Sequence, residues 1–224
     1  FQHYIDHLIT NQKPEDIELM LNKLTTNYTY FMREKEHFEF FTDTILPYLL
    51  KTKKNRVLSI WSAGCSSGEE PYTISMILKE YLGSQASRWD TRVLATDISQ
   101  NVLNRAAAAT YEEASLKDLP AGWKNKYFRP TSQAGFYTVA PTIRDNVIFR
   151  TFNLMDPIQF RLKFDVIFCR NVMIYFDQPT KDALVNRFYQ ATNPGGYLLI
   201  GHSESLNKSK IAYRYLKPAI YRKE

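Results

Sequence analysis

The order of apolar and polar positions divides the chain into two parts with different periodicity. Before residue 56 the apolar side chains recur at helical spacing, which predicts helices over residues 14–24 and 34–50. Pro47 lies in the last turns of the second segment, so we expect the helix to kink or end there. The amino-terminal part is therefore predicted to be helical.

After residue 56, short apolar runs alternate with segments of helical periodicity. The predicted helices cover residues 69–82, 100–109 and 179–190, and Ser99 is a favourable N-cap for the second of them. The sequence Asn-Pro-Gly-Gly at 193–196 is expected to separate the last helix from the next strand. The predicted strands cover residues 57–61, 93–96, 147–152, 164–169, 197–200, 213–216 and 220–222.

This alternation predicts an α/β fold with a mostly parallel sheet and helices on both of its faces. The turn at 217–219 is expected to join the last two strands as an antiparallel hairpin. Residues 111–145 do not fit the alternation, because prolines and glycines interrupt their short apolar runs. They are predicted to form a small inserted hairpin subdomain at the edge of the sheet.

The composition is that of an ordinary globular protein. Of the 224 residues, 44% are hydrophobic and 23% charged, and no apolar run reaches the roughly 18 residues of a membrane span. A formal charge of +6 suits nucleic acid, an anionic membrane or an acidic protein, so charge alone selects no partner. Cys65 and Cys169 have no CxxC partner and are predicted to be reduced thiols. The four histidines are scattered and show no zinc pattern.

The first predicted strand leads into a loop of small residues at 62–68, which is followed by Glu69 and Glu70. Ligands of doubly wound sheets bind beyond the carboxyl ends of the strands, and Gly64 lets the backbone approach a nucleotide there. The loop lacks the Lys of a P-loop. Its two carboxylates favour a ligand with an amino or cationic group, although acids at this place also complement the helix dipole.

Polar residues also follow the next three strands. Asp97 ends the second strand, where an acid can accept hydrogen bonds from a ribose diol or can act as a turn residue. Asn153 closes the third strand, and the fourth runs into Arg170, Asn171 and Tyr175. Because parallel strands end at one edge of the sheet, these side chains predict a crevice for a nucleoside with a polar tail.

Six segments resemble, in order, the signatures of the CheR family, the chemotaxis receptor methyltransferases. They lie at 25–34, 64–72, 95–99, 153–156, 169–177 and 201–206, so the resemblance covers about residue 24 to the end. It implies a class I, Rossmann-like methyltransferase that uses S-adenosylmethionine (SAM). The implied fold has a seven-stranded, mostly parallel sheet, a small inserted antiparallel β-subdomain and a partial amino-terminal helical domain.

The resemblance also implies roles for single residues. Arg33 would pair with the carboxylate of the methionyl part of SAM, Glu69 would hold its amino group, and Asp97 its ribose hydroxyls. Asn153 and Leu154 would border the adenine. The complete set of implied cofactor-binding residues is Asn27, Thr29, Arg33, Ala63, Glu69, Asp97, Asn153, Leu154, Arg170 and Asn171.

The implied reaction converts glutamate side chains of methyl-accepting chemotaxis receptors into methyl esters and leaves S-adenosylhomocysteine (SAH). A glutamate with a pKa of about 4.3 is already ionised at neutral pH and can attack the sulfonium methyl group directly, so no metal is needed. Catalysis then requires alignment. Arg33 and Tyr175 are the catalytic candidates, with Tyr175 orienting the acceptor carboxylate; alternatively, Tyr175 packs under the following helix.

The family implies the cytoplasmic helical region of chemotaxis receptors as partner and a cytoplasmic location. We expect a monomer that neither binds nucleic acid nor inserts into the membrane. Residues 1–45 are interpreted as a partial amino-terminal helical segment with a linker, 46–224 as the catalytic domain and 111–145 as the inserted β-subdomain. The resemblance implies a basic helical domain before the entry motif that grips the receptor, but residues 1–24 are not basic, which argues against this role for them. The compact turn at 131–135 favours a member that does not bind a receptor-tail peptide.

Two other functions stay open. The sequence at 64–68 fits the G-x-S-x-G motif of a serine hydrolase with Ser66 as nucleophile, and Asp177 and His202 follow in the required order. However, the motif follows the first strand rather than a later one, and no Gly-rich oxyanion loop precedes it. The second alternative is an inactive receptor-binding module. Such a module would have a damaged cofactor site, whereas Arg33, Glu69, Asp97 and Tyr175 are all present.

Overall fold

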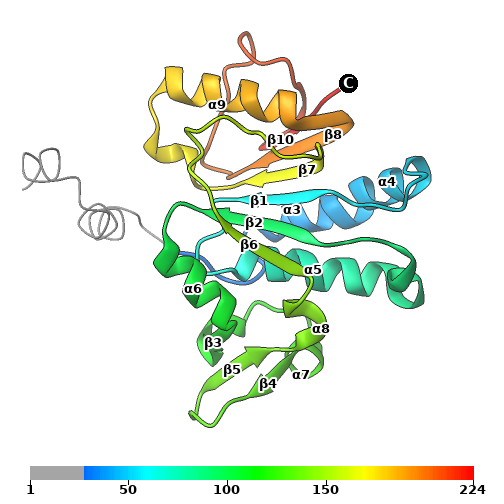
Figure 1. The fold of residues 1–224 in the computed structure, drawn as a ribbon, viewed down its shortest axis with the longest axis vertical. Coiled ribbons are helices and arrows are strands. Elements are labelled where there is room, and N and C mark those ends of the chain that lie inside the picture. Colours follow the sequence, from blue (N-terminus) through cyan, green and yellow to red (C-terminus); the bar gives the residue numbers. More distant parts are fainter. Residues whose placement is uncertain (1–27) are drawn as a thin grey trace, which may run out of the picture.

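The computed structural model describes residues 28–224 (Figure 1). The helix predicted at 14–24 and the site candidate Asn27 lie outside the described residues. Within residues 28–224, none of the helices has the length and apolar character of a membrane span.

Seven strands form the central sheet: β1 (Ile60–Ala63), β2 (Val93–Asp97), β6 (Val147–Thr151), β7 (Phe164–Cys169), β8 (Thr192–Ile200), β9 (Arg214–Lys217) and β10 (Ile220–Arg222). Their order is β6-β2-β1-β7-β8-β10-β9. The pairings from β6 to β8 are parallel, whereas β10 is antiparallel to both neighbours. The predicted mostly parallel sheet with a closing antiparallel hairpin is therefore confirmed.

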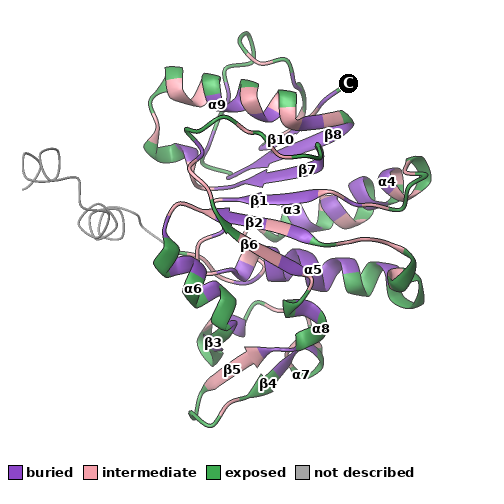
Figure 2. Cartoon of the chain, viewed as in Figure 1, coloured by how far each residue is buried: buried purple, intermediate pink, exposed green. Residues whose placement is uncertain are grey.

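Strand side chains alternate between two hydrophobic cores, one on each face of the sheet. Ile60 and Trp61 are adjacent in β1 yet belong to different cores, and the same holds for Phe168 and Cys169 in β7. The strands are accordingly among the most buried parts of the chain (Figure 2). Helices α3 (Lys35–Phe40), α4 (Leu46–Thr52) and α5 (Glu69–Leu82) complete one core, and α9 (Gln178–Ala191) completes the other.

Helix bounds follow the predictions closely in the α/β part. α5 covers the predicted residues, and α9 extends one residue further at each end than predicted. α6 (Gln100–Ala108) begins where expected, because the Ser99 hydroxyl oxygen accepts a hydrogen bond from Val102 N at 3.3 Å. The shorter helices are η2 (Gly83–Arg88), η3 (Glu113–Leu116), α7 (Trp123–Tyr127), α8 (Pro141–Arg144) and η4 (Met173–Tyr175).

Pro47 does not end the amino-terminal helix. The helix continues to Thr52, and a π-helical turn, η1 (Phe41–Ile45), separates α3 from α4. Proline has no N–H to donate to the preceding turn, and the wider π-turn directly before it accommodates the missing hydrogen bond. Phe41 and Ile45 are fully buried, so this irregular turn belongs to the core.

The inserted subdomain has three antiparallel strands rather than a hairpin alone. β4 (Phe128–Pro130) and β5 (Phe136–Val139) form the predicted hairpin, and β3 (Thr110–Glu112) adds a third strand beside β5. The Tyr127 hydroxyl donates to Glu80 Oε1 of α5 at 2.6 Å. The subdomain therefore packs against α5, at the end of the molecule opposite α9 (Figure 1).

Two strand starts differ from the predictions by three residues or more. β1 begins later than predicted, because Val57 forms only an isolated bridge with Asp90. β8 begins earlier and includes the expected breaker at 193–196, where Gly195 N donates to Lys223 O at 2.8 Å. Gly195 has a φ of +76°, and a Cβ there would lie 2.2 Å from the Tyr48 hydroxyl oxygen, so glycine lets the strand pass close to α4.

Candidate active site

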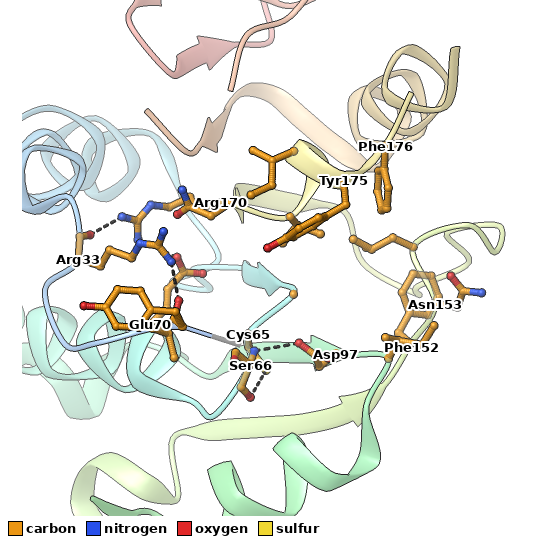
Figure 3. A pocket seen from close by; sticks show the side chains of 18 of the residues that line it. Arg33, Cys65, Ser66, Glu70, Asp97, Phe152, Asn153, Arg170, Tyr175 and Phe176 are labelled. Carbon is orange, nitrogen blue, oxygen red and sulfur yellow. Dashed lines mark hydrogen bonds and ion pairs between the residues drawn. The ribbon is translucent and has the colours of Figure 1, made fainter. Parts of the chain in front are cut away.

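A cavity of about 760 Å³ opens at the carboxyl ends of β1, β2, β6 and β7 (Figure 3). The chain moves from β1 to β2 in one direction and later continues on the other side of β1 with β7, so the strand order reverses here. Such a reversal is where open α/β sheets bind ligands. The sequence-predicted residues that line the cavity are Thr29, Arg33, Asp97, Asn153, Leu154, Arg170, Asn171 and Tyr175.

Gly64 brings the loop after β1 against the loop after β7. Its φ is +83°, and a Cβ would lie 2.4 Å from Val172 Cγ2, closer than two carbon atoms can approach. The N–H groups of Gly64 and Cys65 both donate to Thr96 O of β2 at 2.8 Å. The loop is thereby fixed to two neighbouring strands. Cys65 and Cys169 are both unpaired and buried, and burial raises the pKa of each thiol.

Arg170 is the most connected side chain of the site, although it is only 3% exposed. Its Nε donates to His37 Nδ1 at 2.9 Å, and Nη1 donates to Glu70 Oε2 at 2.8 Å. Nη2 donates to Glu34 Oε2 at 3.1 Å and to the Arg33 carbonyl oxygen. The guanidinium therefore joins the segment before α3 to the start of α5 and the end of β7.

Glu34 and Glu70 neutralise the buried charge of Arg170. Burial by itself would raise the pKa of Glu34, but the Arg170 charge and the hydrogen bonds from Asn171 and His202 lower it overall. Glu70 also accepts a hydrogen bond from the Ser62 hydroxyl at 2.6 Å. One carboxylate thus belongs to the amino-terminal segment and the other to the cavity wall.

His37 serves Arg170 as a neutral hydrogen-bond acceptor. Accepting at Nδ1 requires an imidazole without a proton on that atom. Burial first, and then the adjacent Arg170 charge, lower its pKa from 6.5 to about 3. His37 is therefore uncharged at neutral pH.

Glu34 and His37, three positions apart, gather around this arginine together with the distant His202. Their potential ligand atoms lie within 4.8 Å of one another, although the sequence suggested scattered histidines. However, Arg170 already donates to Glu34 Oε2 and His37 Nδ1. A cation placed among these atoms would be repelled by the guanidinium, so the cluster is a hydrogen-bonding network rather than a metal centre.

Asp97 is held at the cavity with its carboxylate oriented by the backbone. Oδ2 accepts from Ser66 N at 2.9 Å and Oδ1 from Ser99 N at 3.1 Å. Burial raises its pKa, and these backbone hydrogen bonds oppose the rise. The remaining lone pairs of a carboxylate fixed in this way can accept two adjacent hydroxyl groups.

Two sequence-predicted residues, Ala63 and Glu69, are not brought into the wall of the cavity. Gly64 and Glu70, each the next residue in the chain, line it instead. Ala63 is fully buried in the sheet. Glu69 is 5% exposed, and its carboxylate accepts from the Ser67 hydroxyl at 2.8 and 3.0 Å. Successive helical residues point about 100° apart, so only one acid of this pair can face the cavity.

The two ends of the cavity differ in character. Arg33, Glu70 and Arg170 lie at one end, and Phe152 and Asn153 lie at the other (Figure 3). Asn153 Oδ1 accepts from Met155 N at 2.9 Å, and the Leu154 carbonyl oxygen accepts from Arg187 at 2.8 Å. The polar end thus carries the charges, while the other end offers apolar surface and an oriented amide.

Tyr175 and Arg33 stand at the mouth of the cavity. Tyr175 is 58% exposed and its ring projects between the two ends (Figure 3), so it does not pack under α9 as a core residue. Arg33 Nη1 donates to the Tyr28 carbonyl oxygen at 2.7 Å. Both side chains are accessible to a molecule that enters from outside.

Asn171 carries a polar atom with an unmet hydrogen-bonding capacity. Its φ is +59°, and its Nδ2 donates to Glu34 Oε1 at 3.2 Å. Its Oδ1 is buried and has no hydrogen-bond partner among residues 28–224. Since buried polar atoms are normally paired, this oxygen indicates a ligand with a donor group.

Residues of the alternative hydrolase triad have other partners. Asp177 Oδ1 accepts from Thr180 N at 3.0 Å and so caps α9. The His202 ring lies edge-on against His37, with ring centroids 4.4 Å apart. These contacts direct Asp177 and His202 to separate tasks rather than to Ser66.

Sequence reasoning did not name Glu34, His37 or Val172 as parts of the site, and of the two carboxylates after the loop it gave the specific role to Glu69 rather than to Glu70. Glu34 and Glu70 belong to the quoted motifs, so their acidity was visible, but the pairing with Arg170 was not. The residue types of His37 and Val172 give no such signal, although Val172 lies in the motif at 169–177, because their roles depend on contacts across more than a hundred residues.

Comparison with known proteins gives consistent matches. The family model described as "CheR methyltransferase, SAM binding domain" matches residues 27–221. The chemotaxis protein methyltransferase of Borreliella burgdorferi is 43% identical over 100% of this chain and 80% of its own length. Chemotaxis protein methyltransferase 2 of Vibrio cholerae is 37% identical over 93% and 72%. A crystal structure of magnesium protoporphyrin IX methyltransferase from Synechocystis with bound SAH aligns at 14% identity with a TM-score of 0.39, covering 87% of this chain and 68% of that one.

The depressed pKa of His37 predicts a pH-dependent stability. Between pH 6.5 and about 3 the unfolded chain binds a proton at this residue and the folded chain does not, so stability falls as pH decreases. From pH 7 to pH 5 the loss from this residue is about 2 kcal/mol. Urea unfolding of the native chain and His37→Asn should show a shallower decline for the variant. Measurements at pH 8, where His37 is neutral in both states, set the baseline, and equal declines would contradict the prediction.

Proposed function

The chain belongs to the CheR methyltransferase family, and on that premise we propose that it methylates glutamate carboxylates of methyl-accepting chemotaxis receptors in the cavity described above. It is a SAM-dependent enzyme of the class I methyltransferase fold, and its substrates are chemotaxis receptors. We place the reaction in this cavity because residues that follow four different strands line it. The inactive-module and hydrolase alternatives find no support in the comparisons.

Residues of the cavity fit SAM. Its volume of about 760 Å³ lies in the roughly 300–1,000 Å³ range of small-molecule sites. An acid, Asp97, lies where a ribose is expected, and the orphaned Asn171 Oδ1 suits an amino group. Apolar surface at Phe152 and Leu154 suits an adenine ring. When bound, the cofactor supplies a methyl group on a positively charged sulfur.

We assign the residues at the two ends as follows. Asp97 accepts the ribose hydroxyls, and Asn153 with Leu154 borders the adenine. Glu70, rather than Glu69, faces the amino group of the methionyl part. Arg33 pairs with its carboxylate, and Thr29 lines the cavity beside it, while Asn27 stays a candidate from the sequence resemblance alone.

Arg170 lines the methionyl side together with Asn171, but its guanidinium, with five N–H donors, already makes four hydrogen bonds within the protein. It donates to Glu34, Glu70, His37 and the Arg33 carbonyl oxygen. We therefore assign it an indirect role, in which it holds Glu70 in the wall and Arg33 at the mouth. A rigid framework of this kind fixes the ligand before the acceptor arrives.

The transfer step requires few catalytic groups from the protein. A glutamate is ionised at neutral pH, so its oxygen attacks without a general base. Tyr175 and Arg33, both at the mouth, can hydrogen-bond and orient this carboxylate as it enters. Their task is alignment of the oxygen with the methyl group and sulfur, and exclusion of water that would solvate the carboxylate.

The cytoplasmic region of the receptors is the proposed docking partner, and we propose a cytoplasmic monomer that does not insert into the membrane. The proposed division of the chain is an amino-terminal segment to residue 45 and a catalytic domain from 46 to 224, with the β-subdomain at 111–145 inserted. Incubation with labelled SAM and receptor cytoplasmic fragments tests the function. Label that is released as methanol in mild base supports glutamate esters, and no transfer would refute the proposal.

Asp97→Ala should strongly weaken cofactor binding. Losing two hydrogen bonds to a charged acceptor is expected to weaken SAH binding by about 100-fold or more in calorimetric titration. Asp90→Ala is the matched control, because Asp90 precedes the other end of β2 and pairs with Arg92 at 2.6 Å. Unchanged SAH affinity in Asp97→Ala would contradict the assignment.

Glu69 and Glu70 can be separated by isosteric substitution. Glu70→Gln should weaken SAH binding about tenfold or more, because it removes the carboxylate from the cavity and one partner of Arg170. Glu69→Gln should change it by less than about threefold, since Glu69 faces Ser67 instead. The reverse order of effects would restore the role that sequence resemblance gave to Glu69.

Tyr175→Phe should lower kcat about tenfold while the Kd for SAH stays within about twofold, because the hydroxyl serves the acceptor rather than the cofactor. Tyr215→Phe on β9 is the control, since Tyr215 is also partly exposed (38%) but lies on the far hairpin. Equal kcat values for Tyr175→Phe and the native chain would remove Tyr175 from the catalytic residues.

A further inference from the structure

Glu204 is a buried acid to which the proposed reaction assigns no task. It lies in the segment at 201–206 that resembles a family signature, and it is 7% exposed. Burial raises its pKa, and hydrogen bonds from backbone N–H groups oppose that rise. A carboxylate in such a place needs several hydrogen bonds to be tolerated.

Main-chain donors of the loop after β7 surround this carboxylate. Oε2 accepts from Asn171 N at 3.0 Å and from Gly201 N, and Oε1 accepts from Ile174 N at 3.1 Å. Gly201 directly follows β8, so Glu204 ties the end of β8 to the loop that follows β7. These are neighbouring strands of the sheet.

The tied loop has little regular structure of its own. Asn171 has the left-handed φ of +59°, and η4 (Met173–Tyr175) is a single turn of 3-10 helix. The N–H groups in a first helical turn have no partner within the helix. Glu204 satisfies that of Ile174, the residue immediately before Tyr175.

Tyr175 depends on this backbone for its position. Its side chain is 58% exposed, so packing fixes it only weakly, whereas Met173 is fully buried and anchors the loop to the core. Met173 anchors the loop in the core. The hydrogen bonds at Asn171 N and Ile174 N then fix the backbone next to Tyr175, and with it the position of the Tyr175 ring over the cavity.

We infer that Glu204 is a positioning residue of the methyl transfer, which acts by clamping the loop that presents Tyr175 to the acceptor carboxylate. The inference rests on the proposed function, because it requires Tyr175 to contact the acceptor. Glu204 itself touches neither substrate nor cofactor. It fixes the backbone at Asn171 and Ile174, and thereby the position of the Tyr175 ring relative to the cavity.

Glu204→Gln tests the clamp, because the amide keeps the shape but places an N–H₂ against a backbone donor. We expect kcat to fall about fivefold or more, while the Kd for SAH changes by less than about threefold. Amide hydrogen exchange at Asn171 and Ile174 should accelerate by about tenfold or more, whether or not receptor is present.

Asp165→Asn is the matched control. Asp165 is a 2% exposed carboxylate near the start of β7, at the far end from the cavity, and it accepts from Ser59 N at 3.0 Å and Lys53 Nζ at 2.7 Å. Its substitution should lower stability without lowering kcat at temperatures where the chain stays folded. Glu204→Asp, which keeps the charge but shortens the side chain, serves the same test if Glu204→Gln does not fold.

A double-mutant cycle with Tyr175→Phe distinguishes positioning from general destabilisation. If Glu204 acts through Tyr175, the double variant should be no more than about twofold slower than the slower single variant. Three results would each overturn the inference. The kcat losses of the two single variants could multiply in the double variant. The kcat of Glu204→Gln could lie within twofold of the native value, or Asp165→Asn could lose as much kcat as Glu204→Gln. Amide hydrogen exchange at Ile174 can be measured without any turnover. If the native chain transfers no methyl group, the proposed function is refuted, but the effect of Glu204 on the loop can still be measured. If exchange is unchanged in Glu204→Gln, only the clamp is refuted.

Discussion

Burial of the Arg170 guanidinium is the constraint on which the site depends. A charged group removed from water is tolerated only when opposite charges and hydrogen bonds surround it, and loss of one partner typically costs about 3–5 kcal/mol. The partners come from separate parts of the chain: Glu34 and His37 precede or begin α3, and Glu70 lies in the first turn of α5. Arg170 itself follows β7. One side chain thereby forces the amino-terminal helix and two loops of the sheet to meet.

The constraint also gives the cavity its polarity. Arg170 donates hydrogen bonds to groups of the protein itself, and these bonds hold two carboxylates and the Arg33 backbone at the same end of the cavity. His37 completes the set without adding a charge, because its neutral Nδ1 accepts where a protonated imidazole would repel the guanidinium. The opposite end needs no such network and is formed largely by apolar side chains.

Local signals explain what the sequence predicts well. α6 starts at its Ser99 cap, and β7 is an apolar run apart from Asp165, so both can be predicted from neighbouring residues. Motif order located the strand ends and most of the cavity wall. The exceptions need information from distant residues: the network of His37, Glu34 and His202 spans most of the chain, and the strand at 193–196 exists because it pairs with Lys223. Pro47 stays within a helix because a π-turn that the sequence does not announce precedes it.

The pair Glu69 and Glu70 shows why position along the chain is insufficient to assign a role. The two acids are equivalent in a motif, but about 100° of helical rotation separates them. Glu70 faces Arg170 and the cavity. Glu69 faces Ser67, whose carbonyl oxygen accepts from the Tyr111 hydroxyl of the β-subdomain at 2.7 Å. Glu70 thus lines the cavity, whereas Glu69 belongs to the link between the glycine loop and the subdomain, so the two acids have different surroundings despite their adjacent positions.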